Sequence, residues 1–467
     1  MDINYPEENH SPSLTKFESM LRTNNILFFD SNEFENIIHH YLENGKISLA
    51  KKALKLSLDQ HPTSITLKIL KIEILIFENK LNEADKLLSK LFEIDPNNQD
   101  LLIQKANIFS KKDQHKDAIK IFEKALNFSD NESELYSLIG MEYLFLDNYE
   151  SAKIYFKKCI ELDKYDYSSL YNIIYCYEFL HQNHKAIDYL NWFLDQNPYC
   201  EIAWHQLGKQ YLEVNELEKS LSSFDFAIIS DETFIGAYFE KAKVLEKLKR
   251  FKKAIDNYNI AIAIEGPTAY TFLKIGICYE SMKKDDKALK YFFKSVKEDP
   301  VFDKGWIEIT RFYFKRKKLL KSLFYINKAI DIDDANVKYW KLYSKINKSL
   351  LRYNKALTGL KKSIELGDKS FETLIEKVDL LIKIKSFESA KLHLLNLVKE
   401  HPENKEIIFR LSGVLLNLNE SEYGYYYLLS GLKVNKDYVN NFKEIFPDIF
   451  QSAEIQNFIK SYIKSSN

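Results

Sequence analysis

Lysine and arginine dominate residues 304–352, where thirteen basic side chains accompany only four acidic ones. Clustered ammonium and guanidinium groups attract anions, and the attraction grows once these groups are partly desolvated. The segment therefore predicts a site for an acidic peptide segment, the carboxylate at a protein's C-terminus or a phosphate-bearing ligand. The other interpretation is a solvated face in a lysine-rich protein.

Patterns typical of catalysis or cofactor binding are absent from the sequence. It contains no GxGxxG, GxxxxGK, GxSxG or HExxH motif. Two histidine pairs, His39 with His40 and His181 with His184, lack a third ligand at metal spacing. The four cysteines form no CxxC pair, so we expect reduced thiols. These observations predict a protein that is not an enzyme and that carries no cofactor or metal ion.

The composition favours helices as the elements that position the basic residues. Among 467 residues there are only 12 Gly and 9 Pro, while 29% are charged and 45% are hydrophobic. Basic and acidic residues balance at 67 each, so the whole protein has no net charge that would attract nucleic acid or a membrane. The acidic N-terminus lacks an apolar stretch typical of a signal peptide, and we expect a cytoplasmic protein.

A periodic pattern is clearest between residues 204 and 227. In order, it consists of Trp204, Leu207, Gly208, Tyr211, Ser220, Phe224 and Ala227. This series resembles the tetratricopeptide repeat, which has a 34-residue period. Steps of 34 residues from Ser220 in both directions reach only small residues: Ala50, Ala84, Ala118, Ala152, Ala186, Ala254, Ala288, Ser322, Ala356, Ala390 and Gly424. A small residue is needed where two helices cross closely, so the period predicts repeated helical hairpins.

The resemblance implies an all-α, right-handed superhelical solenoid of about twelve helix-turn-helix repeats with a cap helix at each end. We expect repeats over residues 31–438, starting at 31, 65, 99, 133, 167, 201, 235, 269, 303, 337, 371 and 405. Gly208 and Gly276 take the small position of the first helix in this pattern. Residues 1–30 are either a cap helix or a tail that docks on a partner, and residues 439–467 are expected to form the C-terminal cap.

In proteins of this family, positions 2, 5, 9, 12 and 13 of each repeat face a concave groove. Seven basic residues occupy such positions: Lys304, Arg311, Lys315, Lys338, Lys341, Lys345 and Lys348. Apolar residues occupy them elsewhere: Phe77, Met141, Leu144, Phe145, Tyr171, Tyr175, Phe179 and Phe239. Apolar groove residues favour peptide ligands, although they can also pack against neighbouring helices.

We therefore predict a scaffold or adaptor that binds peptide or protein partners in its groove. The alternative is a helical-repeat protein that binds nucleic acid through the basic segment, which also contains aromatic residues such as Phe314.

Overall fold

The computed structural model describes residues 12–23, 26–129, 131–434 and 439–465, and every regular element in these ranges is an α-helix. The predicted all-α fold is therefore confirmed. The protein divides into two compact units, residues 1–237 and 238–467, which we call unit 1 and unit 2. Each unit is described by itself.

The helices of unit 1 are α1 (Pro12–Thr23), α2 (Ser31–Glu43), α3 (Ile47–Gln60), α4 (Ile65–Phe77), α5 (Leu81–Phe92), α6 (Gln99–Lys111), α7 (His115–Leu126), α8 (Glu132–Phe145), α9 (Tyr149–Leu162), α10 (Tyr167–Phe179), α11 (Asn183–Gln196), α12 (Glu201–Glu213) and α13 (Leu217–Ser230).

The helix α14 (Ile235–Lys247) begins at the boundary. Unit 2 continues with α15 (Phe251–Glu265), α16 (Ala269–Ser281), α17 (Asp285–Glu298), α18 (Asp303–Lys315), α19 (Leu319–Ile332), α20 (Val337–Ser349), α21 (Tyr353–Glu365), α22 (Phe371–Lys383), α23 (Phe387–Glu400), α24 (Lys405–Asn417), α25 (Ser421–Val434), α26 (Val439–Ile445), α27 (Pro447–Phe450) and α28 (Ala453–Ser465).

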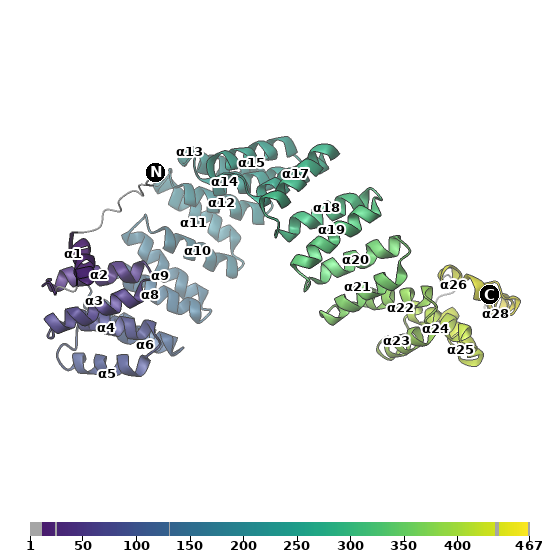
Figure 1. Cartoon of the computed structure of the whole chain (residues 1–467), viewed down its shortest axis with the longest axis horizontal. Helices are drawn as coiled ribbons and strands as arrows, with labels where there is room; N and C mark the ends of the chain where they lie inside the picture. The colour runs from purple at the N-terminus through teal and green to yellow at the C-terminus, as the bar shows by residue number, and fades with distance from the viewer. Residues whose placement is uncertain (1–11, 24–25, 130, 435–438, 466–467) are drawn as a thin grey trace. The chain divides into compact units, whose positions relative to one another are not determined.

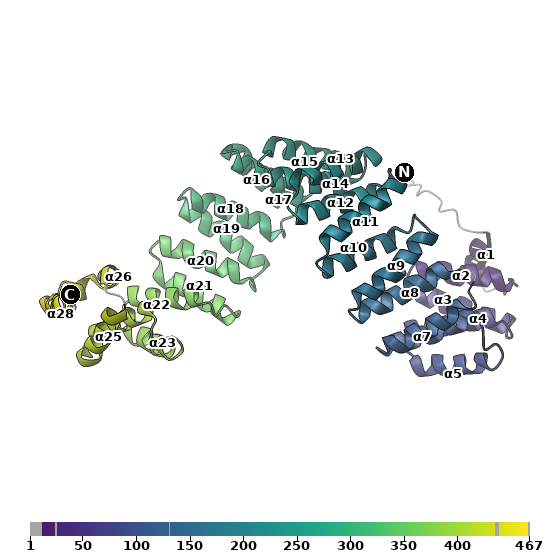
Figure 2. The same ribbon diagram turned by 180° about the vertical axis from the view of Figure 1, so that it is seen from behind.

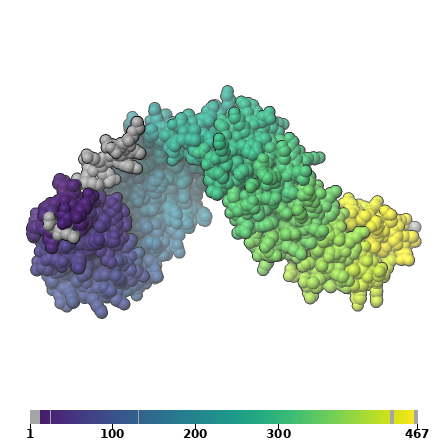
Figure 3. All heavy atoms as spheres, in the orientation of Figure 1, coloured from purple at the N-terminus to yellow at the C-terminus, as the bar shows by residue number. Residues whose placement is uncertain are grey.

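Consecutive helices pack as antiparallel hairpins. We call the members of each pair the first helix and the second helix, as in α12 with α13 or α16 with α17. Within each unit, second helices also contact the first helix of the next pair. Examples are α9 with α10 and α19 with α20, and the order of the helices can be followed in Figures 1 and 2. Side chains fill the space between neighbouring helices (Figure 3). Each unit is thus a solenoid, in which a hairpin buries its apolar side against its neighbours.

The ends of the first helices have recurring local signals. The side chains of Ser64, Asn98 and Asp166 accept hydrogen bonds from backbone N–H groups in the first turns of α4, α6 and α10. After each first helix, one residue has a positive φ, and these residues recur every 34 positions from Gly45 (φ 67°) to Asn419 (φ 61°). The positive φ places a left-handed turn between the two helices of every hairpin, and eleven of the twelve residues that adopt it are not glycine.

The predicted small residues lie where the two helices of a hairpin cross. Ala50, Ala186 and Ala390 are fully buried. Ser220 Oγ donates a hydrogen bond to the Gly208 carbonyl at 2.7 Å, and Ser322 Oγ donates one to the Thr310 carbonyl at 3.0 Å. The two helices are therefore so close that a serine hydroxyl of the second helix reaches a backbone carbonyl of the first.

Apolar residues outside the hairpins cover both ends of the repeat array. Phe17 in α1 and the following Phe29 are fully buried against Phe34 and Tyr41 of the first hairpin. At the other end, α26 buries Phe442 against Phe409 of α24. Both ends of the array thus have their apolar sides covered by extra helices.

Candidate partner-binding surface

The seven predicted basic residues lie on the first helices α18 and α20 of unit 2. We use the name first-helix face for the surface formed by positions 2, 5, 9, 12 and 13 of the repeats. Six of the seven side chains are exposed and Lys341 is partly buried. The Lys345 ammonium of α20 lies 5.7 Å from the centre of the Phe314 ring of α18, so the two helices present one continuous surface.

Carboxylates compensate four of these seven charges. Arg311 pairs with Glu308 at 2.6 Å, one turn earlier on the same helix. The other three partners come from neighbouring elements outside residues 304–352. Lys315 pairs with Glu280 of α16 at 3.1 Å, Lys341 with Asp368 at 2.9 Å and Lys348 with Glu376 of α22 at 2.9 Å. The surface is therefore less positive than a count of charges along the segment suggests.

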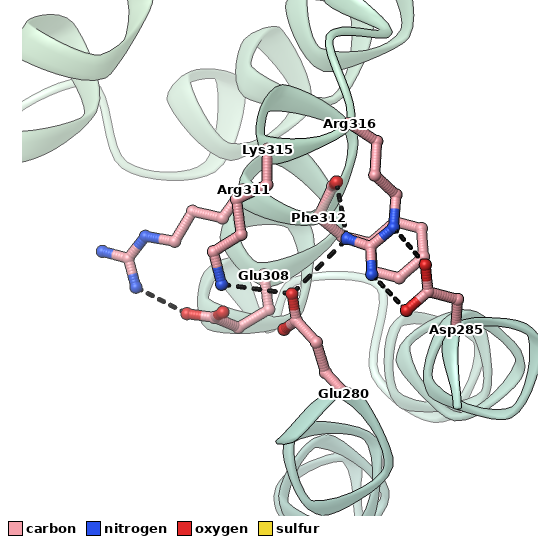
Figure 4. A network of polar contacts seen from close by, with 7 residues as sticks. All are labelled: Glu280, Asp285, Glu308, Arg311, Phe312, Lys315 and Arg316. Atoms are coloured by element: carbon pink, nitrogen blue, oxygen red, sulfur yellow. Dashed lines mark hydrogen bonds and ion pairs between the residues drawn. The ribbon is translucent and has the colours of Figure 1, made fainter. Parts of the chain in front are cut away.

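Arg316, which follows α18, takes part in a network of polar contacts with Glu280 and Asp285 (Figure 4). Its guanidinium lies 3.5 Å from the centre of the Phe312 ring and donates two hydrogen bonds to Asp285, one of 2.6 Å from Nε. This pairing lowers the pKa of Asp285 below its ordinary value. Lys315 and Arg316 border a hollow of about 740 Å³ with Glu280 and Asp285. Arg316 was not among the predicted site residues because it stands just beyond the face positions.

Asp368 is stabilised in its ionised form, which compensates the charge of Lys341. Burial alone would raise the pKa of this carboxyl, but hydrogen bonds from Ser370, Lys341 and Thr373 together hold it well below its ordinary value. Lys341 is thus held in an ion pair that a ligand would have to replace.

Three of the predicted cations have no carboxylate partner among the described residues: Lys304, Lys338 and Lys345. Lys304 and Lys338 occupy the first turns of α18 and α20. Because a helix N-terminus carries a partial positive charge, Lys338 adds to a favourable position for an anion. At α18 the carboxylate of Asp303 already accepts a hydrogen bond of 2.7 Å from the Lys304 backbone N–H. These two lysines and Lys345 are therefore the predicted cations whose charge no ion pair among the described residues compensates.

The predicted apolar set lies mainly in unit 1, and most of it is exposed. The exposed fractions are 69% for Phe77, 37% for Met141, 59% for Phe145, 42% for Tyr171, 43% for Tyr175 and 51% for Phe179. Leu144 is partly buried. Phe239 belongs to unit 2, where it is partly buried near Tyr258 and Tyr270, with ring centres 5.9 and 6.2 Å apart.

Two of the exposed aromatic residues stack on the preceding hairpin. Phe145 stacks on His115 of α7, with ring centres 5.1 Å apart, and Phe179 stacks on Tyr149 of α9 at 4.8 Å. Tyr175 joins the second pair, at 4.6 Å from Phe179. Packing against neighbouring helices therefore applies to these rings in part, while their predicted contact with a peptide ligand stays a prediction.

The histidines and cysteines have structural surroundings. His115 Nδ1 lies 2.8 Å from a carboxylate oxygen of the buried Glu142, a pair that the sequence did not reveal. All four cysteines are free and buried, and burial raises the pKa of Cys176 to about 11 and that of Cys278 to about 12.

Across the residues that the structure describes, no three His, Cys, Asp or Glu side chains are placed to hold a metal ion. None of the helices in these ranges has the length and apolar character required to span a bilayer.

Family models described as tetratricopeptide repeat match residues 75–141, 133–166, 235–266 and 270–300. No curated protein gave a significant match. Similar solved structures include a tetratricopeptide repeat protein from Parabacteroides merdae, with 16% identity over 53% of this chain and 98% of that chain and a TM-score of 0.41. The structure of the APC/C hetero-tetramer Cut9-Hcn1 matches with 14% identity over 86% of this chain and 92% of that chain, with a TM-score of 0.37. YrrB, a TPR protein with an unusual peptide-binding site, matches with 19% identity over 40% of this chain and 97% of that chain, with a TM-score of 0.32.

The matched segments lie within the row of hairpins that repeats every 34 residues, with a small residue at each crossing and a left-handed turn in each hairpin. The chain therefore contains tetratricopeptide repeats.

Proposed function

We propose that this protein is a non-catalytic scaffold or adaptor, and that the first-helix face of α18 and α20 binds an acidic segment of a protein partner. The observation that carries the proposal is the group of three exposed lysines without carboxylate partners among the described residues, Lys304, Lys338 and Lys345. Their ammonium groups are free to pair with carboxylates of a ligand.

The interleaved carboxylates favour a protein segment over a nucleic acid. Glu280, Glu308 and Glu376 lie among the basic residues of the same surface. A continuous phosphate backbone would meet these negative charges, whereas a peptide can place its acidic side chains at the three available lysines and neutral ones elsewhere. The buried, free cysteines fit a reducing compartment such as the cytoplasm.

The proposal is tested by fluorescence anisotropy with a labelled peptide rich in Asp and Glu. We expect the triple variant K304E/K338E/K345E to bind this peptide about tenfold more weakly, which corresponds to ~1.4 kcal/mol. The matched control reverses three exposed lysines of second helices, Lys290, Lys328 and Lys361, and should bind as the wild type does. Equal affinities of the two triple variants would refute the proposed site.

Random single-stranded RNA serves as the competing probe in the same titration. Binding of RNA that weakens steeply with salt, together with no binding of the acidic peptide, would favour the nucleic-acid alternative.

A further inference from the structure

Four carboxylates from four successive first helices of unit 1 border one hollow of about 330 Å³, which we call the acidic hollow. They are Glu35 of α2, Glu73 of α4, Asp100 of α6 and Glu134 of α8. Each occupies position 2, 5 or 9 of its repeat, so the acidic hollow belongs to the first-helix face. This part of the protein thus carries the charge opposite to that of α18 and α20.

Among the described residues, none of the four carboxylates of the acidic hollow forms an ion pair, although the charge of His39, which also borders the hollow, acts on Glu73. The ion pairs in the described part of unit 1 involve other carboxylates, namely Glu78, Asp117, Glu142, Glu150 and Glu216. Glu35 accepts hydrogen bonds, but its donors are the neutral hydroxyls of Ser31 and Thr66. In unit 2, by contrast, Glu280 of the first-helix face pairs with Lys315.

Two further features of the acidic hollow bear on the kind of ligand it would take. Burial raises the pKa of Glu73, the charge of His39 counteracts this shift, and Glu134 adds to it. Gln104 also borders the hollow and is only 8% exposed. Its Oε1 accepts one long hydrogen bond from Asn107, at 3.4 Å, and can accept a second one from a ligand. A cation with N–H donors would stabilise both groups.

The spacing of the four carboxylates suits several organic cations rather than one metal ion. First helices of successive repeats are separated by roughly the 8–10 Å of packed helices or more. Consistent with this spacing, no three such ligands come together at a single point anywhere among the described residues. Lysine or arginine side chains of an extended segment could each reach a different carboxylate.

Exposed aromatic residues continue from the acidic hollow along the same helix face. On α8, Glu134, Met141 and Phe145 stand seven and four residues apart, which places them on one side of the helix. Phe145 lies about 16 Å from Glu134 along the axis, because each residue advances the helix by ~1.5 Å. The next first helix, α10, contributes Tyr175 and Phe179. Acidic and aromatic parts therefore form one surface of unit 1.

We infer that this surface of unit 1 binds a peptide segment in which lysine or arginine residues adjoin bulky apolar residues. The cationic side chains occupy the acidic hollow and pair with Glu73 and Glu134, while the apolar side chains cover Phe145 and Phe179. The charge of the hollow excludes nucleic acid and acidic peptides from this site. The ligand class is thus distinct from the acidic segment proposed for unit 2.

Anisotropy titrations with two labelled peptides test this inference. One peptide combines lysine with leucine and tryptophan, and in the second every lysine is replaced by the neutral glutamine. We expect only the first to bind, with an affinity that decreases as salt is raised. The variant E73Q/E134Q should weaken this binding on the order of tenfold, since it removes two charges and keeps the side-chain shapes. The variant F145A/F179A should weaken it as well.

The control variant D85N/E161Q removes two exposed carboxylates from the second helices α5 and α9, and it should bind as the wild type does. Circular dichroism confirms that each variant retains its helices. Unchanged affinity in either E73Q/E134Q or F145A/F179A, or equal loss in the control, would overturn the inference.

This inference shares with the proposed function only the use of the first-helix face, and the two can fail separately. The E73Q/E134Q variant should leave binding of the acidic peptide unchanged, and K304E/K338E/K345E should leave binding of the basic peptide unchanged.

Discussion

Replacing Gly208 with alanine should destabilise the protein although alanine is the better helix former. A Cβ atom at this position would lie 2.6 Å from Cε1 and 2.8 Å from Cδ1 of Phe224, a ring that is fully buried. Overpacking of this kind costs about 1 to 3 kcal/mol, and such short contacts favour the upper part of that range. The helix propensity of alanine offsets about 1 kcal/mol. We therefore expect a net loss of about 2 kcal/mol.

The same reasoning predicts rescue by a smaller residue at position 224. The variant F224L alone should lose stability because it leaves a cavity, whereas G208A/F224L should be more stable than the sum of the two single changes predicts. The coupling free energy should be about 2 kcal/mol, well above the ~0.5 kcal/mol seen for independent sites.

Urea denaturation followed by circular dichroism measures these differences, and hydrogen exchange of α12 and α13 localises them if the solenoid does not unfold in one step. Gly236 provides the control, because a Cβ there would lie 3.6 Å from its nearest neighbours, an ordinary contact distance. G236A should not destabilise the protein. Additive effects in the G208A and F224L cycle, or a G208A variant as stable as G236A, would refute the packing argument.

Three further predictions concern a turn, a buried charge and the N-terminal helix. Leu351→Gly should raise the free energy of unfolding by about 1 kcal/mol in urea melts. The exposed Leu351 adopts a left-handed φ of 59°, a conformation that costs leucine about this much free energy and that glycine adopts without strain. Glu73→Gln should stabilise the protein at neutral pH. Burial raises the pKa of Glu73 in the folded state, so the protonated side chain contributes its full stability below the unfolded pKa near 4.5 and this contribution is lost as the pH rises through the folded pKa. Thermal melts of the variant and the wild type should therefore converge in acid. Deleting residues 1–30 should lower the Tm because it exposes Phe34 and Tyr41, whereas a docking tail could be removed without this effect.

The periodic small residues made the fold predictable. A spacing of 34 residues between positions such as Ala186 and Ser220 requires a repeated close crossing, and only helical hairpins of this length provide one. The sizes of the two facing side chains at positions 8 and 24 of a repeat are also complementary. Gly208 and Gly276 accompany phenylalanine at the facing position, while Ile38 and Ile72 accompany leucine. This complementarity was present in the sequence and explains why some repeats use glycine.

The charge of the basic surface was only partly predictable. A count over residues 304–352 omits the carboxylates that neighbouring helices bring to it, so the pairing of Lys315 with Glu280 and of Lys348 with Glu376 required the structure. The acidic hollow was missed for a related reason. Its residues are dispersed over a hundred positions, and only their shared places in successive repeats, such as Asp100 and Glu134, bring them together. The stacking of Phe145 on His115 likewise depends on contacts between repeats.

Site-specific photo-cross-linking in cells tests most directly whether partners bind the first-helix face. A photoreactive amino acid replaces either Tyr175 or Lys345, which lie on first helices, or Trp192 or Lys328, which are exposed on second helices. Tyr175 and Trp192 are matched in exposure at 43% and 48%. We predict cross-linked protein partners from the first-helix positions and not from the second-helix ones. Cross-links of equal yield from both surfaces, or from the second helices alone, would contradict the proposed binding surface.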